Sequence, residues 1–183
     1  ADDAMPRLVA QELAAPLGQQ VYVEDHPGAS GTIGAEVAAR AAPDGYSFMV
    51  ATTTHMVTPH FYKLSYDFQR DFEPVTLMAT SPFVLLAHPA LPVRSLQDLI
   101  KLARANPGKL NYSATATGST TMLSCELFKA TTGVNITHVP YKSVGAALVD
   151  ALAGQVPLTM SVAASSLVQV KAGRLRALAV TTP

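Results

Sequence analysis

The first part of the chain shows one helical pattern followed by alternating extended and helical patterns. Apolar residues recur at helical spacing between Met5 and Leu17, and Gly18 is a typical residue to end such a helix. Thr32 is a suitable N-cap for a second helix. The expected elements are helices over 5–17, 32–41 and 52–62, a turn-rich loop over 26–31, and strands over 21–23 and 46–51.

From residue 83 onward, strands and helices alternate at regular intervals. Ser95 is expected to cap the first helix of this part. The pattern predicts an extended run over 83–86, helices over 96–105, 117–132, 143–153 and 165–171, and strands over 110–114, 137–141, 157–162 and 175–181. Such alternation is typical of an α/β layered fold with a mostly parallel sheet.

The pattern of predicted helices and strands differs between the two parts of the chain, which predicts two lobes. The first lobe is expected over 1–75 and the second over 89–183. The stretch 76–88, which carries extended runs on both sides of Ser81 and Pro82, is predicted to be a crossover linker.

Composition narrows the class of protein. Of the 183 residues, 49% are apolar and 14% are charged, which argues against disorder. Basic and acidic residues balance, so the basic excess of a nucleic-acid binder is missing. No apolar run approaches a membrane span, and the first residues lack the features of a signal peptide. Either the protein is cytoplasmic, or a signal was removed, or the chain begins inside a domain.

Three loops that follow predicted strands are rich in hydroxyl groups and glycine. Ligands of open α/β sheets bind beyond the carboxyl ends of strands, where helix N-termini offer backbone N–H groups and partial positive charge to an anion. The same residue types also make ordinary caps and turns, and the pattern alone does not decide between the two interpretations. The candidate residues are Thr52, Thr53 and Thr54 in the first loop, Thr117, Gly118, Ser119 and Thr120 in the second, and Tyr141, Ser143 and Gly145 in the third.

Residues for catalysis, cofactors or metals do not form a recognisable set. Cys125 is the single cysteine and lies in a helical pattern, where a buried core thiol is expected. His55 and His60 are five residues apart, which matches no common pair of metal ligands. A hydrolase that uses Cys125 and His138 is a third hypothesis, but the sequence shows no arrangement of nucleophile and base. We therefore expect no enzyme activity, no cofactor and no metal.

Several segments carry a resemblance that spans almost the whole chain. They read HPGASGTIGAE (26–36), AAPDGY (41–46), LNYS (110–113), ELF (126–128), HVPYK (138–142) and KAGRLRALAV (171–180). In this order they resemble the substrate-binding receptors of tripartite tricarboxylate transporters, the Bug or TctC family. The resemblance implies an α/β, two-lobed periplasmic-binding-protein fold of type II, the Venus-flytrap form.

The resemblance also implies a function. Such receptors lie in the bacterial periplasm, hold a small carboxylate between the lobes and deliver it to a membrane permease. By position, Thr52, Thr53 and Thr54 match the family's ligand loop in the first lobe. Residues 117–120 match the helix N-terminus of the second lobe, and residues 141–145 match a further loop that lines the cleft.

Departures from the family pattern leave alternatives open. The family's opening strand with its glycine-rich loop and its C-terminal return are missing, so the first lobe is expected to be incomplete. Met122 stands where the family usually has histidine, and Ser161, a further candidate ligand residue, stands where it has aspartate. The second change argues against an amino acid ligand. The chain is then either a carboxylate receptor or a binding-deficient fragment or sensor that contacts a partner protein, with dimerisation through exposed sheet edges.

Overall fold

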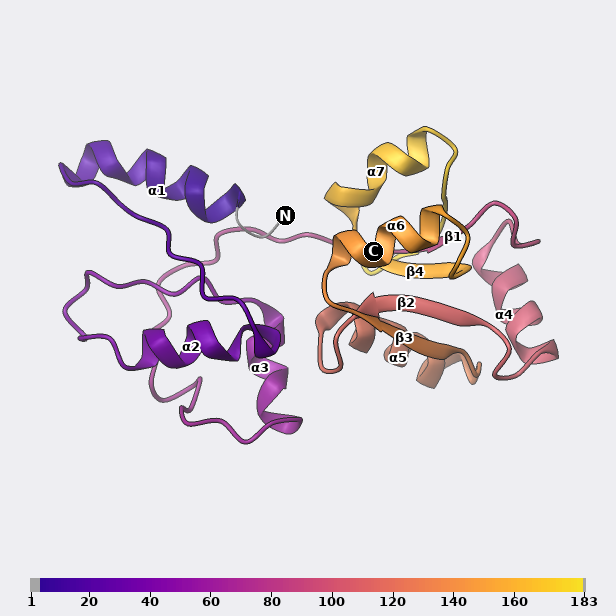
Figure 1. Cartoon of the computed structure of the whole chain (residues 1–183), viewed down its shortest axis with the longest axis horizontal. Coiled ribbons are helices and arrows are strands. Elements are labelled where there is room, and N and C mark those ends of the chain that lie inside the picture. The colour runs from indigo at the N-terminus through magenta and orange to yellow at the C-terminus, as the bar shows by residue number, and fades with distance from the viewer. Residues whose placement is uncertain (1–3, 183) are drawn as a thin grey trace. The chain divides into compact units, whose positions relative to one another are not determined.

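The computed structural model describes residues 4–182 (Figure 1). The chain divides into two compact units, Ala1–Val75 and Thr76–Pro183, which we call the first unit and the second unit.

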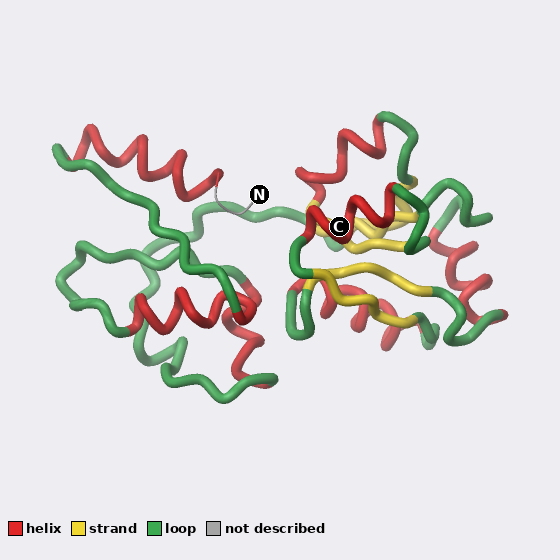
Figure 2. The backbone as a smooth tube through the Cα atoms, in the orientation of Figure 1, coloured by secondary structure: helices red, strands yellow, loops and turns green. Residues whose placement is uncertain are grey.

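The first unit consists of short helices joined by long loops (Figure 2). Pro59 has no N–H to continue an α-helix, so the helix predicted over 52–62 changes into a 3₁₀ turn. The elements are α1 (Ala4–Leu17), the 3₁₀ turn η1 (Ala29–Gly31), α2 (Thr32–Ala39), α3 (Thr53–Val57) and η2 (Thr58–His60).

The two strands predicted in the first unit, over 21–23 and 46–51, do not form. Both segments are extended, but no other described segment of this unit hydrogen-bonds to them as a strand. A strand needs such a neighbour, because its backbone N–H and C=O groups otherwise bond to water. The apolar side chains stay in solvent: the exposed fraction is 78% for Tyr22, 88% for Tyr46 and 68% for Phe48.

A small aromatic cluster packs the middle of the first unit. The ring of Phe68 lies 6.1 Å from that of His55 and 5.4 Å from that of Phe72, measured between centroids. Tyr66 meets Phe72 edge to face at 6.0 Å and is buried. These contacts bring the segment 66–72 against α3.

The second unit is a five-stranded sheet with helices on both faces. The strand order is β3-β2-β4-β1-β5. The strands are β1 (Phe83–Ala87), β2 (Asn111–Thr115), β3 (Thr137–Tyr141), β4 (Leu158–Val162) and β5 (Arg176–Val180). The helices are α4 (Leu96–Ala105), α5 (Thr120–Thr132), α6 (Val144–Leu152) and α7 (Ala163–Lys171).

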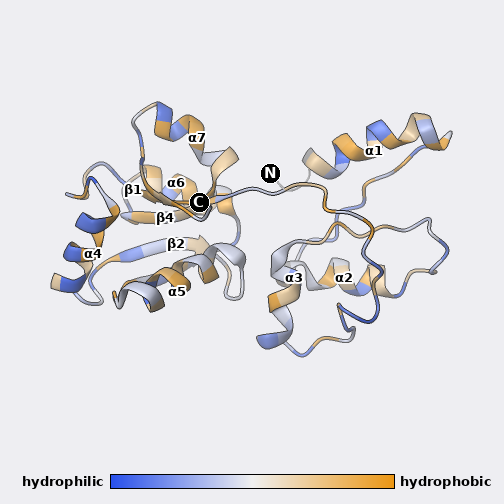
Figure 3. Cartoon of the chain, turned by 180° about the vertical axis from the view of Figure 1, so that it is seen from behind, coloured by the Kyte–Doolittle hydropathy of each residue, from blue (hydrophilic) through white to orange (hydrophobic). Residues whose placement is uncertain are grey.

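Successive side chains of β1 point to opposite faces of the sheet, and each face has its own hydrophobic core. Leu85 and Ala87 point into the larger core, which also contains Leu99 of α4 and Cys125 of α5. Val84 and Leu86 point to the other face, into a core with Leu148 and Ala151 of α6. In Figure 3, β4 is largely orange, whereas α4 shows blue, hydrophilic residues beside orange ones.

One expectation about this sheet was wrong in part. The stretch 76–88 is not a linker throughout, because residues 83–87 form β1. This strand is paired on both sides and its residues 84–87 are buried. The sheet is mostly parallel, as expected: β2, β3, β4 and β5 share one direction, and β1 runs antiparallel to its neighbours β4 and β5.

Candidate functional site

The carboxyl ends of three strands meet at one edge of the second unit. Strands β3, β2 and β4 are neighbours and run in parallel, so their ends lie side by side at the usual strand spacing of about 4.8 Å. Each strand leads into a helix, namely α6, α5 and α7, respectively. Three helix N-termini therefore bring backbone N–H groups without intrahelical partners and partial positive charge to this edge, which favours an anion, although the Ala163 N–H at the start of α7 donates to the carbonyl of Pro82 at 3.0 Å.

The loop between β2 and α5 is a tight turn. Gly118 adopts a φ of +83°, a left-handed conformation that favours glycine, and Ser119 N–H donates to the carbonyl of Ala116 at 3.0 Å. The Ser119 hydroxyl accepts a hydrogen bond from Met122 N–H at 3.3 Å and so caps α5. Ser119 is buried and Thr117 is exposed, so these two candidates have different roles.

Sequence reasoning missed Thr121, which lies directly under this loop. Its Oγ1 accepts a hydrogen bond from Thr115 N–H at 3.2 Å, and it lies 2.7 Å from Thr115 Oγ1 and 3.2 Å from Ser119 Oγ. The sequence contains a signal for this in its dense run of threonines and serines, but it does not show which hydroxyls point inward.

The loop between β3 and α6 also contains a serine that caps the following helix. Ser143 accepts a hydrogen bond from Ala146 N–H at 3.2 Å, so its hydroxyl caps α6, while Ser143 and Gly145 are both exposed. The Tyr141 hydroxyl donates to Asp150 Oδ2 at 2.7 Å. This hydrogen bond, together with burial, raises the pKa of Tyr141. A phenol that already donates to a carboxylate has no proton left for a ligand.

Ser161, at the end of β4, lies inside the second unit. It is 1% exposed, and its Oγ lies 3.4 Å from Ser165 Oγ, which donates to the carbonyl of Val162 at 2.9 Å. The structure thus brings the candidates of the second and third loops and Ser161 to one edge, but Ser161 does not reach solvent there.

The first candidate loop belongs to the first unit and is organised by His55. Thr52 N–H donates to Nδ1 of the buried His55 at 3.1 Å, and the Thr52 hydroxyl lies 3.3 Å from the same nitrogen. Thr52 and Thr53 are exposed, and Thr54 is half-buried. His55 occupies the third helical position after the cap, where capping boxes place glutamate or glutamine. The sequence T-x-x-H was therefore the signal that could have revealed its role.

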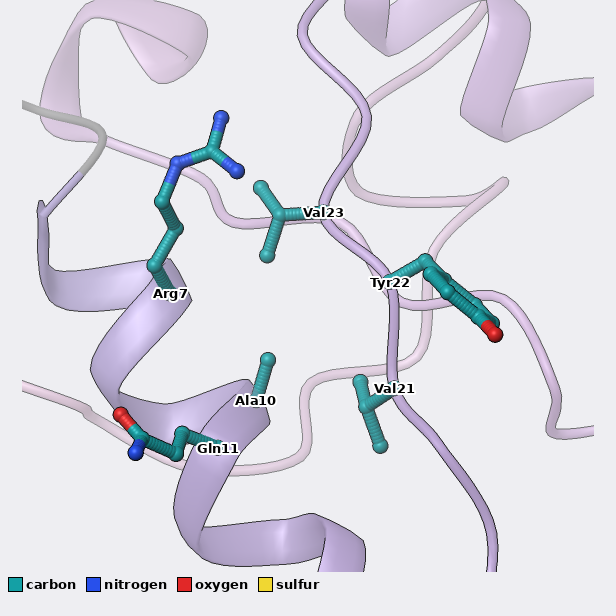
Figure 4. A pocket seen from close by; sticks show the side chains of 6 residues that line it. All are labelled: Arg7, Ala10, Gln11, Val21, Tyr22 and Val23. Carbon is teal, nitrogen blue, oxygen red and sulfur yellow. The ribbon is translucent and has the colours of Figure 1, made fainter.

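Two surface hollows lie away from these loops. One, of about 310 Å³, is in the first unit between α1 and residues 21–23, and its lining includes Arg7 and Tyr22 (Figure 4). Arg7 forms an ion pair with Asp25 at 2.8 Å. The other hollow, of about 270 Å³, is in the second unit and is lined mainly by apolar side chains such as Leu127 and Val180. Neither hollow contains a candidate residue.

Cys125, the nucleophile of the hydrolase hypothesis, lies in the larger core instead, and His138 is half-buried on β3. Cys125 is fully buried, and burial, with a smaller contribution from Glu126, raises its pKa to about 12. His138 stacks on Tyr112 at 5.1 Å between centroids, and Tyr112 donates to Glu126 at 2.7 Å. Such a thiol is protonated at neutral pH and is not a nucleophile.

Residues 4–182 contain neither a candidate metal site nor a candidate membrane-spanning helix. Within that range, His, Cys, Asp and Glu side chains form no group of three or more that could bind a metal ion. None of the helices in the same range is long and apolar enough to cross a membrane.

The fold and the edge of helix N-termini define a class, the periplasmic solute-binding proteins. A Rhodopseudomonas palustris protein solved with adipate, Rpa4515, superposes with a TM-score of 0.89 at 41% identity, over 98% of this chain and 61% of its own. MatC from the same organism, solved with malate, gives a TM-score of 0.85 at 30% identity, over 100% of this chain and 63% of its own. These likenesses confirm the predicted fold class.

The family follows from the sequence comparisons. The model of the tripartite tricarboxylate transporter family receptor, TctC, matches residues 5–183, and the chain belongs to this family. A UPF0065 protein of Pseudomonas sp. (strain P51) is 36% identical over 181 residues, which cover 98% of this chain. The chain spans 54% of that relative and thus about half of its length.

Proposed function

We propose that this chain is part of a periplasmic receptor that binds a small carboxylate for a tripartite tricarboxylate transporter. The observation that carries the proposal is the single edge at which β2, β3 and β4 lead into α5, α6 and α7. Three helix N-termini attract an anion without a basic side chain. The adipate and malate in the relatives' solved structures support a carboxylate with one or more acid groups.

The contacts in the second unit favour certain groups as ligand donors. Thr117 is exposed in its turn, and Ser143 and Gly145 are exposed before α6. The hydroxyls of Ser119 and Tyr141 are engaged in hydrogen bonds within the protein. We propose that the ligand is held mainly by backbone N–H groups and Thr117, and that Ser119 and Tyr141 shape the loops. Ser161 contributes through its packing.

We propose that Thr53 and Thr54, at the start of α3, are the ligand-contacting residues of the first unit. Ligand that contacts both lobes stabilises their closed arrangement through its differential contacts, and the membrane permease then takes the ligand from this form. No step in this cycle makes or breaks a covalent bond, so no cofactor is required.

A thermal-shift and calorimetric titration with adipate, malate, succinate and citrate tests the proposal. An acid at about 100 times its Kd is expected to stabilise the protein by roughly 2.7 kcal/mol. A second arm uses a chimera in which the adipate-bound relative supplies the end segments. Binding by the chimera alone identifies this chain as a binding-deficient portion, and no binding by either protein contradicts the carboxylate function.

Two glycines at opposite ends of α5 provide a matched pair of variants. Gly118 and Gly133 both have positive φ, +83° and +68°, and an alanine at either position costs about 1–2 kcal/mol of folding stability. Gly118→Ala also distorts the proposed ligand turn, so only this variant is expected to weaken binding. Equal binding losses from both variants would show that the turn is not part of the site.

A second candidate function is a module that contacts a partner protein, including a second copy of this chain. The exposed Tyr46 and Phe48 favour it, as do β3 and β5, the outer strands of the described sheet. Analytical ultracentrifugation over a range of concentrations tests self-association. A monomer at all concentrations argues against the second copy.

A further inference from the structure

We propose that Thr121 is a positioning residue for the ligand loop between β2 and α5. The inference rests on the proposed carboxylate function but concerns a residue that does not touch the ligand. Thr121 is buried, with 4% of its surface exposed, and is the second residue of α5. Its hydroxyl faces the end of β2 rather than solvent.

The hydrogen bonds of the Thr121 hydroxyl use its full capacity. A hydroxyl group has one proton and two lone pairs. Thr115 N–H occupies one lone pair, and the proton and second lone pair serve the hydroxyls of Thr115 and Ser119. Whichever of these two hydroxyls donates, Thr121 has no capacity left for a ligand.

The hydrogen bonds of the Thr121 hydroxyl connect the two ends of the turn between β2 and α5. Thr115 is the last residue of β2, and Ser119 is the N-cap of α5. Between them lie residues 116–118, closed by the hydrogen bond from Ser119 N–H to Ala116. With strand end and helix cap bonded to one buried oxygen, the turn cannot shift without breaking several hydrogen bonds. Thr121 thereby holds Thr117 and the turn's backbone in one arrangement before ligand arrives, which lowers the ordering cost of binding.

The test compares two substitutions at Thr121 with the same change elsewhere in the sheet. Thr121→Val keeps the shape and removes the hydroxyl, whereas Thr121→Ser keeps the hydroxyl. The control is Thr159→Val, because Thr159 is also buried and its hydroxyl donates to the carbonyl of Ser113 at 3.2 Å. Thr159 lies near the start of β4, at the opposite end from the ligand edge.

Two measurements are made on each variant: the Kd for adipate and malate, and amide hydrogen exchange of peptides covering residues 115–122 without ligand. Thr121→Val is expected to weaken binding about tenfold or more and to speed exchange in the loop. Thr121→Ser is expected to stay within about threefold of the unmodified Kd. Thr159→Val is expected to lower the melting temperature and leave both the Kd and loop exchange unchanged.

Each outcome decides between the claims. Unchanged affinity in Thr121→Val, or an equal loss in Thr159→Val, overturns the positioning role. If neither the unmodified protein nor the chimera binds any of the four acids, the proposed function fails, while loop exchange still decides whether Thr121 orders the turn. Unaltered exchange then rejects the inference as well. Should Thr121→Val not fold, Thr115→Val removes the closest hydroxyl contact and is expected to shift both readouts in the same direction.

Discussion

Gly31 lies so close to the ring of His55 that a β-carbon on Gly31 would be 2.7 Å from Nε2. The opposite ring nitrogen, Nδ1, accepts the Thr52 N–H. The imidazole therefore stands between the turn that precedes α2 and the loop that begins α3. Two candidate features of the first unit, a glycine turn and a threonine loop, are linked through one buried side chain.

Gly31→Ala is expected to destabilise the first unit more than Gly45→Ala. Both glycines have similar positive φ, +87° and +82°, so both variants incur the same backbone strain. Only the alanine at position 31 also meets the His55 ring, since nothing lies within 4 Å of a β-carbon at position 45. Urea denaturation followed by circular dichroism measures the difference. Equal losses of stability would mean that the ring moves aside freely.

His55→Ala is expected to cost about 0.5–2 kcal/mol of stability, because Thr52 N–H loses its acceptor. His55→Gln keeps an acceptor at the same helical position and is expected to recover much of that loss. The exposed His60, in the following 3₁₀ turn, provides the control variant His60→Ala. Hydrogen exchange of residues 50–57 locates the effect. A glutamine variant as unstable as the alanine variant would assign the stability to ring packing on Phe68 instead.

His138 makes the second unit sensitive to mild acid. Burial lowers its pKa below the ordinary 6.5, although Glu126 nearby acts in the other direction and Lys129 adds to the lowering. The unfolded chain therefore takes up the proton first, and stability is lost as the pH falls below 6.5. His138→Phe, which can retain the stack on Tyr112, is expected to flatten the stability profile as the pH falls below 6.5.

A second acid transition provides the control for this experiment. Glu126 is buried in part, which raises its pKa, but hydrogen bonds from Lys129 and Tyr112 outweigh burial and lower it below the ordinary 4.5. Its stabilising contribution is present above pH 4.5 and is lost as the pH falls through the lower folded-state value. This loss persists in His138→Phe. A variant with the unmodified profile just below pH 6.5 would contradict the role of His138.

Cys125 is expected to resist alkylation in the folded protein. It is fully buried, and its raised pKa of about 12 leaves almost no thiolate at about pH 8. Because it is the single cysteine, iodoacetamide labelling followed by mass spectrometry reports on this site alone. Labelling is expected to be slow in buffer and fast in urea. Fast labelling of the native protein would show that α5 opens readily.

The sequence predicted the second unit closely because its signals are local. The helix over 96–105 was predicted to the residue, since Ser95 caps it by accepting Asp98 N–H at 3.1 Å. The strand over 137–141 was also correct. The apolar run at 46–51 looked equally like a strand, but strand formation depends on a partner elsewhere in the chain, which sequence pattern does not reveal.

The candidate loops were harder to resolve than the elements. The residue types at 117–120 and 141–145 indicated helix N-termini, and the structure has helices starting at Thr120 and Val144. What the pattern could not show is the direction of each hydroxyl. Ser119 points inward and Tyr141 donates to Asp150, nine residues later, so both are engaged within the protein.

The position of β1 between β4 and β5 in the sheet determines when β1 can pair during folding. The strand Phe83–Ala87 is made before any of its neighbours, yet it pairs with Leu158–Val162 and Arg176–Val180. It therefore stays unpaired, with its apolar residues exposed, until those two segments are available. Contacts this distant in sequence slow folding and leave time for aggregation. The chain is therefore expected to need protection from aggregation until β4 and β5 can pair with β1.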